Sequence, residues 1–585
     1  MSHDASRSSS DRARGRLLQL AVSVVTAGPL VAFSAIRYFD YDEAWHVFIA
    51  EQKMAQNFWY EVASNAHPPL FYLLLGQVIA FGKTLLVYRS IGIAAAIGSS
   101  FLVGRILMRL GASLSTSLLM SAAFALSGST LRVGVEIRAY MLAGCFGLMA
   151  FHGFLDLLSG GLARPALAPR LLFGLGALLA ILTHYSSLFV FAGCGMATLA
   201  CLALSPECRQ PTLAGFTSRA ASNVGMLLPP LVALPLVAVH IQRASAFSVG
   251  HLSPFIYDPA RQSVGGFLAD QTVNLSRLFV PLAPSDVSRA ALALLMCGFT
   301  LVMLWRHGSR GGALLRATPA IVATTILICL AIGGLLGRYP YGGEVRHQYV
   351  IYPYLVIAFG VAVDLFCRQV RTRWKKPATA ALTVAALLNG AVGLAALPWI
   401  SGRPYQFQVD SFRRSLPSTP TVLVDQFTLI VAFMHHDEWN WTWEGASTAD
   451  AGAPEPVLLH VWRVSSDDRA FHVCGARTIL KVDLDSLRTF KALDACRRLV
   501  GSARVALLTI DPAAVVSTTP IGALPIDSAS STARLAQEAG LSLEKLWRST
   551  AVASPDDQFD RSTIFAELAG ASSGAASAGV SPARP

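Results

Sequence analysis

Three carboxylates lie close together early in the chain, at Asp40, Asp42 and Glu43. Acids that precede a helix often cap it and stay hydrated, and on these residues alone capping is the commoner interpretation. A carboxylate at the rim of a membrane can also accept the proton of a hydroxyl nucleophile or bind a metal ion. The segment is therefore a first candidate for general-base chemistry.

Two further positions could meet an anionic oxygen. His67 precedes Pro68 and Pro69, which favour an extended entry into the next helix, so the histidine either is solvated on a stiff turn or donates to an anion. Arg89 begins an apolar run, where its guanidinium either binds a lipid phosphate or extends along the membrane surface.

Glu136 and Arg138 stand on a short turn between two apolar runs, just before Tyr140. They could simply pair with each other, but ionisable groups so near hydrocarbon are costly and indicate a site. His184 and Tyr185 interrupt another apolar stretch, and a buried core histidine is as good an interpretation there as a functional one.

The last polar cluster runs from Arg338 to Tyr349 and includes Glu344, Arg346 and His347. Arginine presents a planar fork of donors that suits phosphate oxygens. One such arginine is weak evidence. Polar clusters from separate loops, all on one side of a membrane, are stronger evidence because they could converge on one site.

The composition indicates the class of protein that positions these residues. Of the 585 residues, 53% are hydrophobic and only 14% charged, and the mean hydropathy is +0.50. A soluble protein carries about a quarter charged residues, so a soluble enzyme and a disordered chain are excluded. The chain has a net charge of +12, and its basic excess lies before residue 400, where basic residues cluster between apolar runs. That pattern is typical of a polytopic membrane protein, and we expect no nucleic-acid partner.

We expect about 11 transmembrane helices, because a span needs about 20 mostly apolar residues. The runs are 17–39, 90–108, 114–134, 141–158, two short helices within 171–204, 224–241, 290–305, 317–336, 350–366 and 378–397. This arrangement puts the arginine clusters in the cytoplasm and the acids outside, as the positive-inside rule requires. Residues 68–81 are too short for a span, and we interpret them as a helix in the outer interface.

Four domains follow from these patterns. They are a cytoplasmic N-terminal segment (1–16), a transmembrane catalytic domain (17–400), a C-terminal periplasmic α/β domain (401–568) and a disordered tail (569–585). The α/β prediction rests on strand-like runs at 421–424, 457–461, 478–482 and 505–510 and a helix-like segment at 486–499. Cys474 and Cys496 lie in this domain and could pair, although spacing alone does not decide it.

The order of five motifs resembles the integral-membrane GT-C glycosyltransferases, especially the protein O-mannosyltransferase and aminoarabinose (lipid A) transferase group. The motifs are Asp42-Glu43-Ala44, His67-Pro68-Pro69-Leu70, Glu136-Ile137-Arg138-Ala139-Tyr140, Thr183-His184-Tyr185 and Arg346-His347-Gln348-Tyr349. Each motif alone is weak, but five in register are specific. The resemblance covers residues 17–400.

The resemblance implies transfer of a sugar from a polyprenyl-phosphate donor to an acceptor hydroxyl, normally with inversion at the anomeric carbon. It implies Asp42 as catalytic base with Glu43 as helper or structural partner. We expect His67, Arg89, Arg138 and Arg346 to bind the donor phosphate. We expect six more residues to bind substrate: Glu136, Tyr140, His184, Tyr185, His347 and Tyr349.

Some questions stay open at the level of sequence. Tyr140 stands where several relatives carry an acid, so Glu136 substitutes for that acid or no second acid is needed. A divalent cation at Asp42 and Glu43 is an open alternative, since some relatives bind one. The acceptor is a lipopolysaccharide or lipid A, another envelope lipid, a polysaccharide or a protein. We expect a bacterial inner-membrane enzyme with a periplasmic active site; the alternative is a transporter or flippase of lipid-linked sugar.

Overall fold

The computed structural model describes the chain in segments. They are residues 9–37, 67–82, 84–159, 167–204, 255–278, 285–307 and 313–370, six strands between 421 and 520, and scattered positions within 43–62 and 231–239. The chain divides into two compact units. One unit contains the long helices, and the other contains the strands together with the described positions from Ile36 to Val62.

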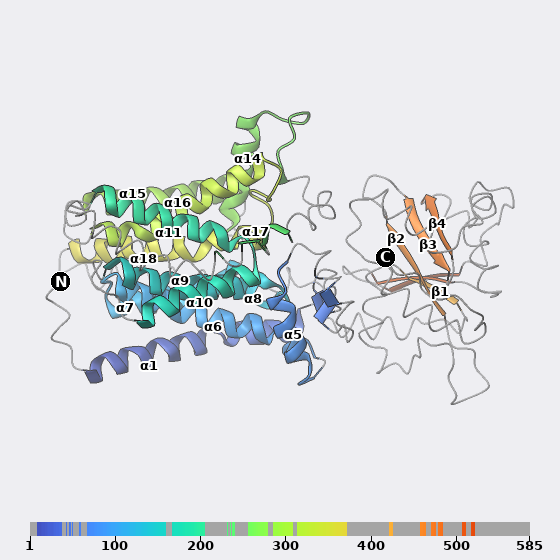
Figure 1. The fold of residues 1–585 in the computed structure, drawn as a ribbon, viewed down its shortest axis with the longest axis horizontal. Coiled ribbons are helices and arrows are strands. Elements are labelled where there is room, and N and C mark those ends of the chain that lie inside the picture. Colours follow the sequence, from blue (N-terminus) through green and yellow to red (C-terminus); the bar gives the residue numbers. More distant parts are fainter. Residues whose placement is uncertain are drawn as a thin grey trace. The chain divides into compact units, whose positions relative to one another are not determined.

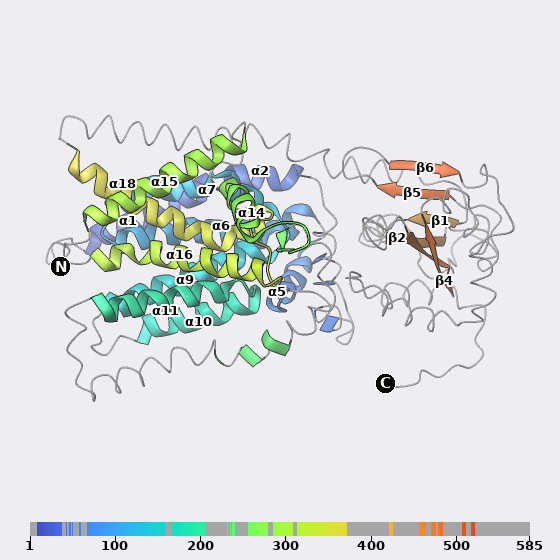
Figure 2. The ribbon, with the colours of Figure 1, turned by 90° about the horizontal axis from the view of Figure 1, so that it is seen from above.

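The helical unit is a bundle whose long helices run side by side (Figures 1 and 2). Its helices are α1 (Ser9–Thr26), α2 (Gly28–Ile36), α5 (Leu70–Ile79), α6 (Leu85–Arg109), α7 (Leu114–Ala125), α8 (Gly128–Val135), α9 (Ala139–Ser159), α10 (Leu167–Thr183), α11 (Ser187–Leu204), α14 (Val264–Leu275), α15 (Asp286–Arg306), α16 (Ala313–Leu335), α17 (Val345–Gln348) and α18 (Tyr352–Gln369). Two 3-10 turns, η3 (Ser276–Leu278) and η4 (Tyr349–Ile351), adjoin α14 and α18. The short helices α5, α8 and α17 lie at the same end of the bundle (Figure 1).

The predicted membrane character is confirmed. Within the described residues, six helical segments are long and apolar enough to cross a membrane, namely Ala13–Ala35, Leu85–Arg109, Ala139–Ser159, Asp286–Arg306, Leu314–Leu335 and Val345–Gln369. The bent pair α7 and α8, at 53° to each other, makes a seventh if counted as one span. The apolar helices α10 and α11 coincide with the two short helices predicted in 171–204. The count of eleven and the sidedness stay predictions, since 224–241 and 378–397 lie largely outside the described residues.

The predicted helix at 68–81 is present over residues 70–79, as α5. Helix α5 has only ten residues, which at about 1.5 Å per residue is half the hydrocarbon thickness. It packs against α6 and α10, and its Phe71, Tyr72 and Leu75 are buried. Its placement in the outer interface stays a prediction.

Local signals start and stop the bundle helices. Ser113, Ser127 and Ser285 each accept the backbone N–H three residues later and so cap α7, α8 and α15. Close helix contact depends on glycine. A Cβ on Gly176 of α10 would come within 2.7 Å of the Ala150 nitrogen of α9, so these helices approach each other because this position has no side chain.

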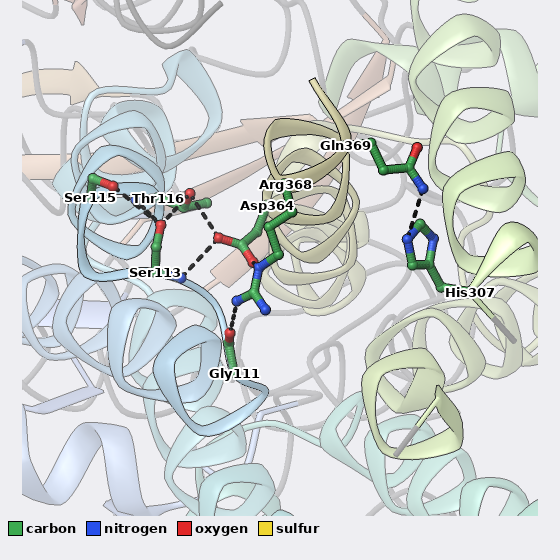
Figure 3. A network of polar contacts seen from close by, with 8 residues as sticks. All are labelled: Gly111, Ser113, Ser115, Thr116, His307, Asp364, Arg368 and Gln369. Atoms are coloured by element: carbon green, nitrogen blue, oxygen red, sulfur yellow. Dashed lines mark hydrogen bonds and ion pairs between the residues drawn. The ribbon is translucent and has the colours of Figure 1, made fainter. Parts of the chain in front are cut away.

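A polar network ties α18 to the start of α7 (Figure 3). The buried Asp364 carboxylate accepts the Ser113 backbone N–H at 2.8 Å and pairs with Arg368 at 2.7 Å. Arg368 also donates to the carbonyl of Gly111, whose φ of +83° turns the chain between α6 and α7. The carboxylate thereby satisfies a free N–H at a helix start, and the arginine satisfies a carbonyl of the preceding turn.

The second unit contains a six-stranded mixed sheet in the order β4-β3-β2-β1-β5-β6 (Figure 2). The strands are β1 (Thr421–Val424), β2 (Val457–Arg463), β3 (Ala470–Gly475), β4 (Thr478–Asp483), β5 (Ala506–Ile510) and β6 (Val516–Pro520). The central β1 is parallel to β2 and β5, with Val422 opposite Leu458 and Ala506, and the outer pairs are antiparallel. All four predicted strands are present, and the sequence interpretation missed β3 and β6.

Other predictions for this part of the chain lie outside the described residues. They are the helix at 486–499, the pairing of Cys474 with Cys496 and the tail from 569. The periplasmic location of the domain stays a prediction.

Candidate functional site

Four predicted site residues from distant parts of the sequence bring their rings together. The His184 ring centroid lies 4.5 Å from that of Tyr140 and 5.0 Å from that of His67. The His347 ring lies 6.1 Å from Tyr140. We call His67, Tyr140, His184 and His347 the ring cluster. It joins the segment before α5, the first turn of α9, the turn between α10 and α11, and α17.

The hydrogen bonds of His184 define its state. Its Nδ1 accepts the backbone N–H of Ser186 at 3.2 Å and lies 2.7 Å from the Ser186 hydroxyl. Because Nδ1 is an acceptor, the proton of the neutral ring is on Nε2. Burial, and secondly the positive charge of Arg138, lower the pKa of His184 to about 3. At neutral pH His184 is therefore an uncharged hydrogen-bond donor.

Arg138 is held beside this ring by a tight backbone turn. Its N–H donates to the carbonyl of Glu136 at 2.8 Å, which closes the turn between α8 and α9. The Arg138 side chain is buried, and its charge acts on His184. The predicted convergence of the 136–140 motif with the 183–185 motif is thus present in the structure.

A chain of ion pairs connects α8 with α17. Arg132 Nε lies 3.8 Å from Glu136 Oε1, and Arg132 also lies 3.5 Å from Glu344 Oε2. The same Glu344 oxygen is 3.2 Å from Arg346. We call Glu136, Arg132, Glu344 and Arg346 the ion chain. The sequence interpretation missed Arg132, although its spacing of four residues from Glu136 on a helix was a usable signal.

The loop before α17 is fastened by buried polar groups. The Tyr339 hydroxyl donates to the carbonyl of His347 at 2.9 Å, and the Gln348 amide donates to the carbonyl of Pro340 at 2.7 Å. Burial, and secondly the nearby Tyr140, raise the pKa of Tyr339 well above its ordinary value, so it stays a hydroxyl. Tyr339 also belongs to the site by contact, but its residue type alone did not single it out.

Phe255 extends the ring cluster. Its ring centroid lies 6.4 Å from that of His347, and its carbonyl accepts the backbone N–H of Tyr341 at 3.0 Å. An aromatic ring beside polar ones offers an apolar face to a sugar ring. The sequence interpretation missed this residue, which lies in a loop without a motif.

Three predicted site residues also make contacts away from the ring cluster. Arg89 is fully buried on α6 and donates to the carbonyl of Ser34 near the end of α2, at 2.7 Å. Tyr349 shares a hydrogen bond with Thr130 of α8 at 3.1 Å. Tyr185 packs with apolar residues around Ile181. These contacts fasten helices to one another, and the predicted roles of the three in binding donor or substrate stay predictions.

Glu43, the described acid of the first loop, belongs to the other compact unit. Glu43 is fully buried, and its carboxylate lies 3.5 Å from the buried Arg37 guanidinium. A buried carboxylate needs such a partner. The predicted base Asp42 lies outside the described residues, as does Asp40.

Among the described residues, no group of three or more His, Cys, Asp and Glu side chains could hold a metal ion. The predicted alternative of a cation at Asp42 and Glu43 stays a prediction, since Asp42 is not among those residues.

Neither a protein-family model nor a curated protein matches the chain. Several solved structures do. ArnT from Cupriavidus metallidurans matches in the apo state (13% identity, TM-score 0.49) and bound to undecaprenyl phosphate (12%, 0.47), each over 84% of this chain and 92% of that one. The Archaeoglobus fulgidus oligosaccharyltransferase matches over 83% of this chain and 67% of its own (12%, 0.45).

The S. cerevisiae protein O-mannosyltransferase Pmt1-Pmt2 complex bound to the sugar donor also matches, at 16% identity and a TM-score of 0.32, over 40% of this chain and only 35% of that one. At these values the roles of residues must be derived from this chain's own geometry. These four solved structures are of integral-membrane GT-C glycosyltransferases, the same group that the motifs resemble.

Proposed function

We propose that this protein is a membrane glycosyltransferase that moves a sugar from a polyprenyl-phosphate donor to an acceptor hydroxyl on the periplasmic side of a bacterial inner membrane. The observation that carries the proposal is the convergence of the ring cluster with Arg138 at one end of the bundle. A lipid-linked donor requires such a place, because its prenyl tail stays in the bilayer while the phosphate and sugar reach the surface.

The reaction has two needs. A hydroxyl is a poor nucleophile until its proton is accepted, and we assign that role to Asp42. The oxygen of the acceptor hydroxyl then bonds to the anomeric carbon of the donor sugar, as the bond between that carbon and the phosphate oxygen breaks. The electron pair leaves with polyprenyl phosphate, whose charge must be stabilised. We assign that second task to Arg138, Arg346 and His67.

Glu43 has a supporting role in this proposal. Its carboxylate is buried and lies 3.5 Å from the Arg37 guanidinium, so we assign it to fastening this segment. The neutral Nε2–H of His184 suits a hydroxyl of the donor or acceptor sugar better than a phosphate, because it offers a hydrogen bond without a charge.

The test is mass spectrometry of envelope lipids, polysaccharides and proteins from wild-type, deletion and Asp42→Asn strains. We expect one sugar mass to disappear in both mutants, and the molecule that loses it identifies the acceptor. The matched control is Asp364→Asn, which makes the same change in a buried carboxylate of the α18 network. Each variant must be as abundant as wild type.

A sugar that persists in Asp42→Asn but vanishes in the deletion would contradict the assignment of the base. That result would favour transport of a lipid-linked sugar, because a flippase needs no proton acceptor. A sugar lost equally in Asp364→Asn would show that the loss follows from disturbed folding.

A further inference from the structure

Two arginines converge on a single oxygen atom in the ion chain. Glu344 Oε2 lies 3.2 Å from Arg346 and 3.5 Å from Arg132. The two guanidiniums come from different elements, α17 and α8, which only the fold brings together. A paired set of guanidiniums is the arrangement that proteins use to bind the oxygens of a phosphate group.

The Glu344 side chain contacts the two arginines and does not cap its own helix, α17. Glu344 occupies the N-cap position of α17, where an acidic side chain normally accepts a backbone N–H of the first turn, but its side chain makes no such bond. Its backbone carbonyl accepts the N–H of His347 at 3.0 Å. One carboxylate oxygen, the buried Oε2, instead faces the two arginines.

The Glu344 carboxylate can leave while its backbone stays. The preceding backbone is anchored, because Tyr341 donates to the Phe255 carbonyl and a Cβ on Gly342 would lie 2.2 Å from the Gln271 carbonyl oxygen. By contrast, the Glu344 side chain is 40% exposed. A rotation about its own bonds is enough to move it into water.

The four named members of the ion chain carry equal numbers of positive and negative charges. Arg132 and Arg346 carry two positive charges, and Glu136 and Glu344 carry two negative ones. Glu136 is buried and so cannot move into water as Glu344 can. If Glu344 swings out, the ion chain loses one negative charge, and a phosphate diester supplies one negative charge in its place.

We propose that Glu344 occupies the place of a donor phosphate oxygen in the donor-free protein, and that Arg132 joins Arg346 in binding the phosphate once it displaces this carboxylate. The inference rests on the proposed function. It adds a second phosphate-binding arginine, Arg132, and a carboxylate of the protein itself, Glu344, that competes with the phosphate. By competing for the arginines, Glu344 lowers the affinity of the site for any lipid phosphate. This includes the polyprenyl phosphate that remains after transfer, whose release Glu344 therefore favours.

A purely structural ion bridge between α8 and α17 makes a different prediction. In that case, substitution of any member loosens the site and weakens binding. If Glu344 competes with the ligand, its neutralisation must strengthen binding, whereas neutralisation of Arg132 must weaken it. The two substitutions therefore have opposite effects only if the proposal holds.

The experiment measures undecaprenyl phosphate binding to the full-length protein in nanodiscs by native mass spectrometry. We expect Glu344→Gln to tighten binding about threefold to tenfold and Arg132→Gln to weaken it by a similar factor, since an ion pair at partly exposed sites contributes roughly 1 kcal/mol. Arg132→Lys keeps the charge and should weaken it less. The matched control is Asp258→Asn. It breaks the exposed ion pair of Asp258 with Arg261 and should leave binding unchanged.

Each other result overturns the inference. Unchanged or weaker binding in Glu344→Gln contradicts competition, and unchanged binding in Arg132→Gln contradicts a second ligand. If wild type binds no undecaprenyl phosphate, the proposed function fails as well, which separates the two cases. Inorganic phosphate at equal concentration should not displace the lipid; displacement would contradict a lipid-linked ligand.

Discussion

Acidification should destabilise the protein through His184, and the substitution His184→Asn should remove that sensitivity. The ring is buried, its Nδ1 accepts the Ser186 N–H, and its pKa is lowered to about 3. Asparagine can present an oxygen near the position of Nδ1 but does not titrate. The variant thus keeps the acceptor and loses the proton equilibrium.

The sign and size follow from proton linkage. Above the ordinary histidine pKa of 6.5, His184 is neutral in both the folded and the unfolded chain, so its titration contributes nothing. As the pH falls below 6.5 the unfolded chain gains a proton that the folded protein does not bind until about pH 3. Between pH 7 and pH 5 this lowers the free energy of unfolding by about 2 kcal/mol, at about 1.4 kcal/mol per pH unit.

The assay is denaturant or thermal unfolding in detergent at pH 5, 6 and 7, with wild type and His184→Asn compared at each pH. Wild type should lose about 2 kcal/mol more than the variant over this interval. Because Arg138 contributes to lowering the pKa of His184, Arg138→Met should shift protonation of the folded ring to a higher pH. Parallel losses in wild type and His184→Asn would refute the assignment of a buried neutral ring.

Three further predictions concern stability. Arg89→Met should lower the free energy of unfolding by about 2 to 4 kcal/mol, because it leaves the buried Ser34 carbonyl without this donor; unchanged thermal stability with lost undecaprenyl phosphate binding would instead assign Arg89 to the ligand alone. Gly176→Ala should cost about 1 to 3 kcal/mol by forcing α10 from α9, whereas Gly298→Ala, with nothing within 4 Å of the added Cβ, should be neutral or stabilising in the same melts. Asp364→Asn should cost about 1 to 3 kcal/mol, since the Arg368 pair is lost and the cap of α7 weakened, and an unaltered melting temperature would contradict the network in Figure 3.

Much of the helical fold could be predicted from sequence. In hydrocarbon, backbone groups must bond within their own segment, so an apolar run of sufficient length has to be a helix. The run at 90–108 corresponds to α6, and the run at 141–158 corresponds to α9, each within a few residues. In the sheet, the apolar β1, β2, β4 and β5 were predicted. The edge strand β6 was missed because it contains Ser517, Thr518 and Thr519 in place of an apolar run.

For the candidate site, the sequence predicted the ring cluster but not the partners of its charged residues. Residue type and motif order selected His67, Tyr140, His184 and His347 from the sequence alone, and the structure brings their rings together. The sequence also places these polar groups next to apolar runs, where an uncompensated polar group is costly, and it therefore indicates a functional site.

Only the tertiary structure decided which partner each charged group has. Arg89 pairs with a carbonyl 55 positions earlier in the chain, and Arg132 pairs with Glu344, from a different helix. A sequence shows where a charge is, but its partner depends on how helices pack and which side chains then face each other. The charge pattern therefore determined a membrane protein with polar clusters, and packing decided that Glu344 stands between two arginines.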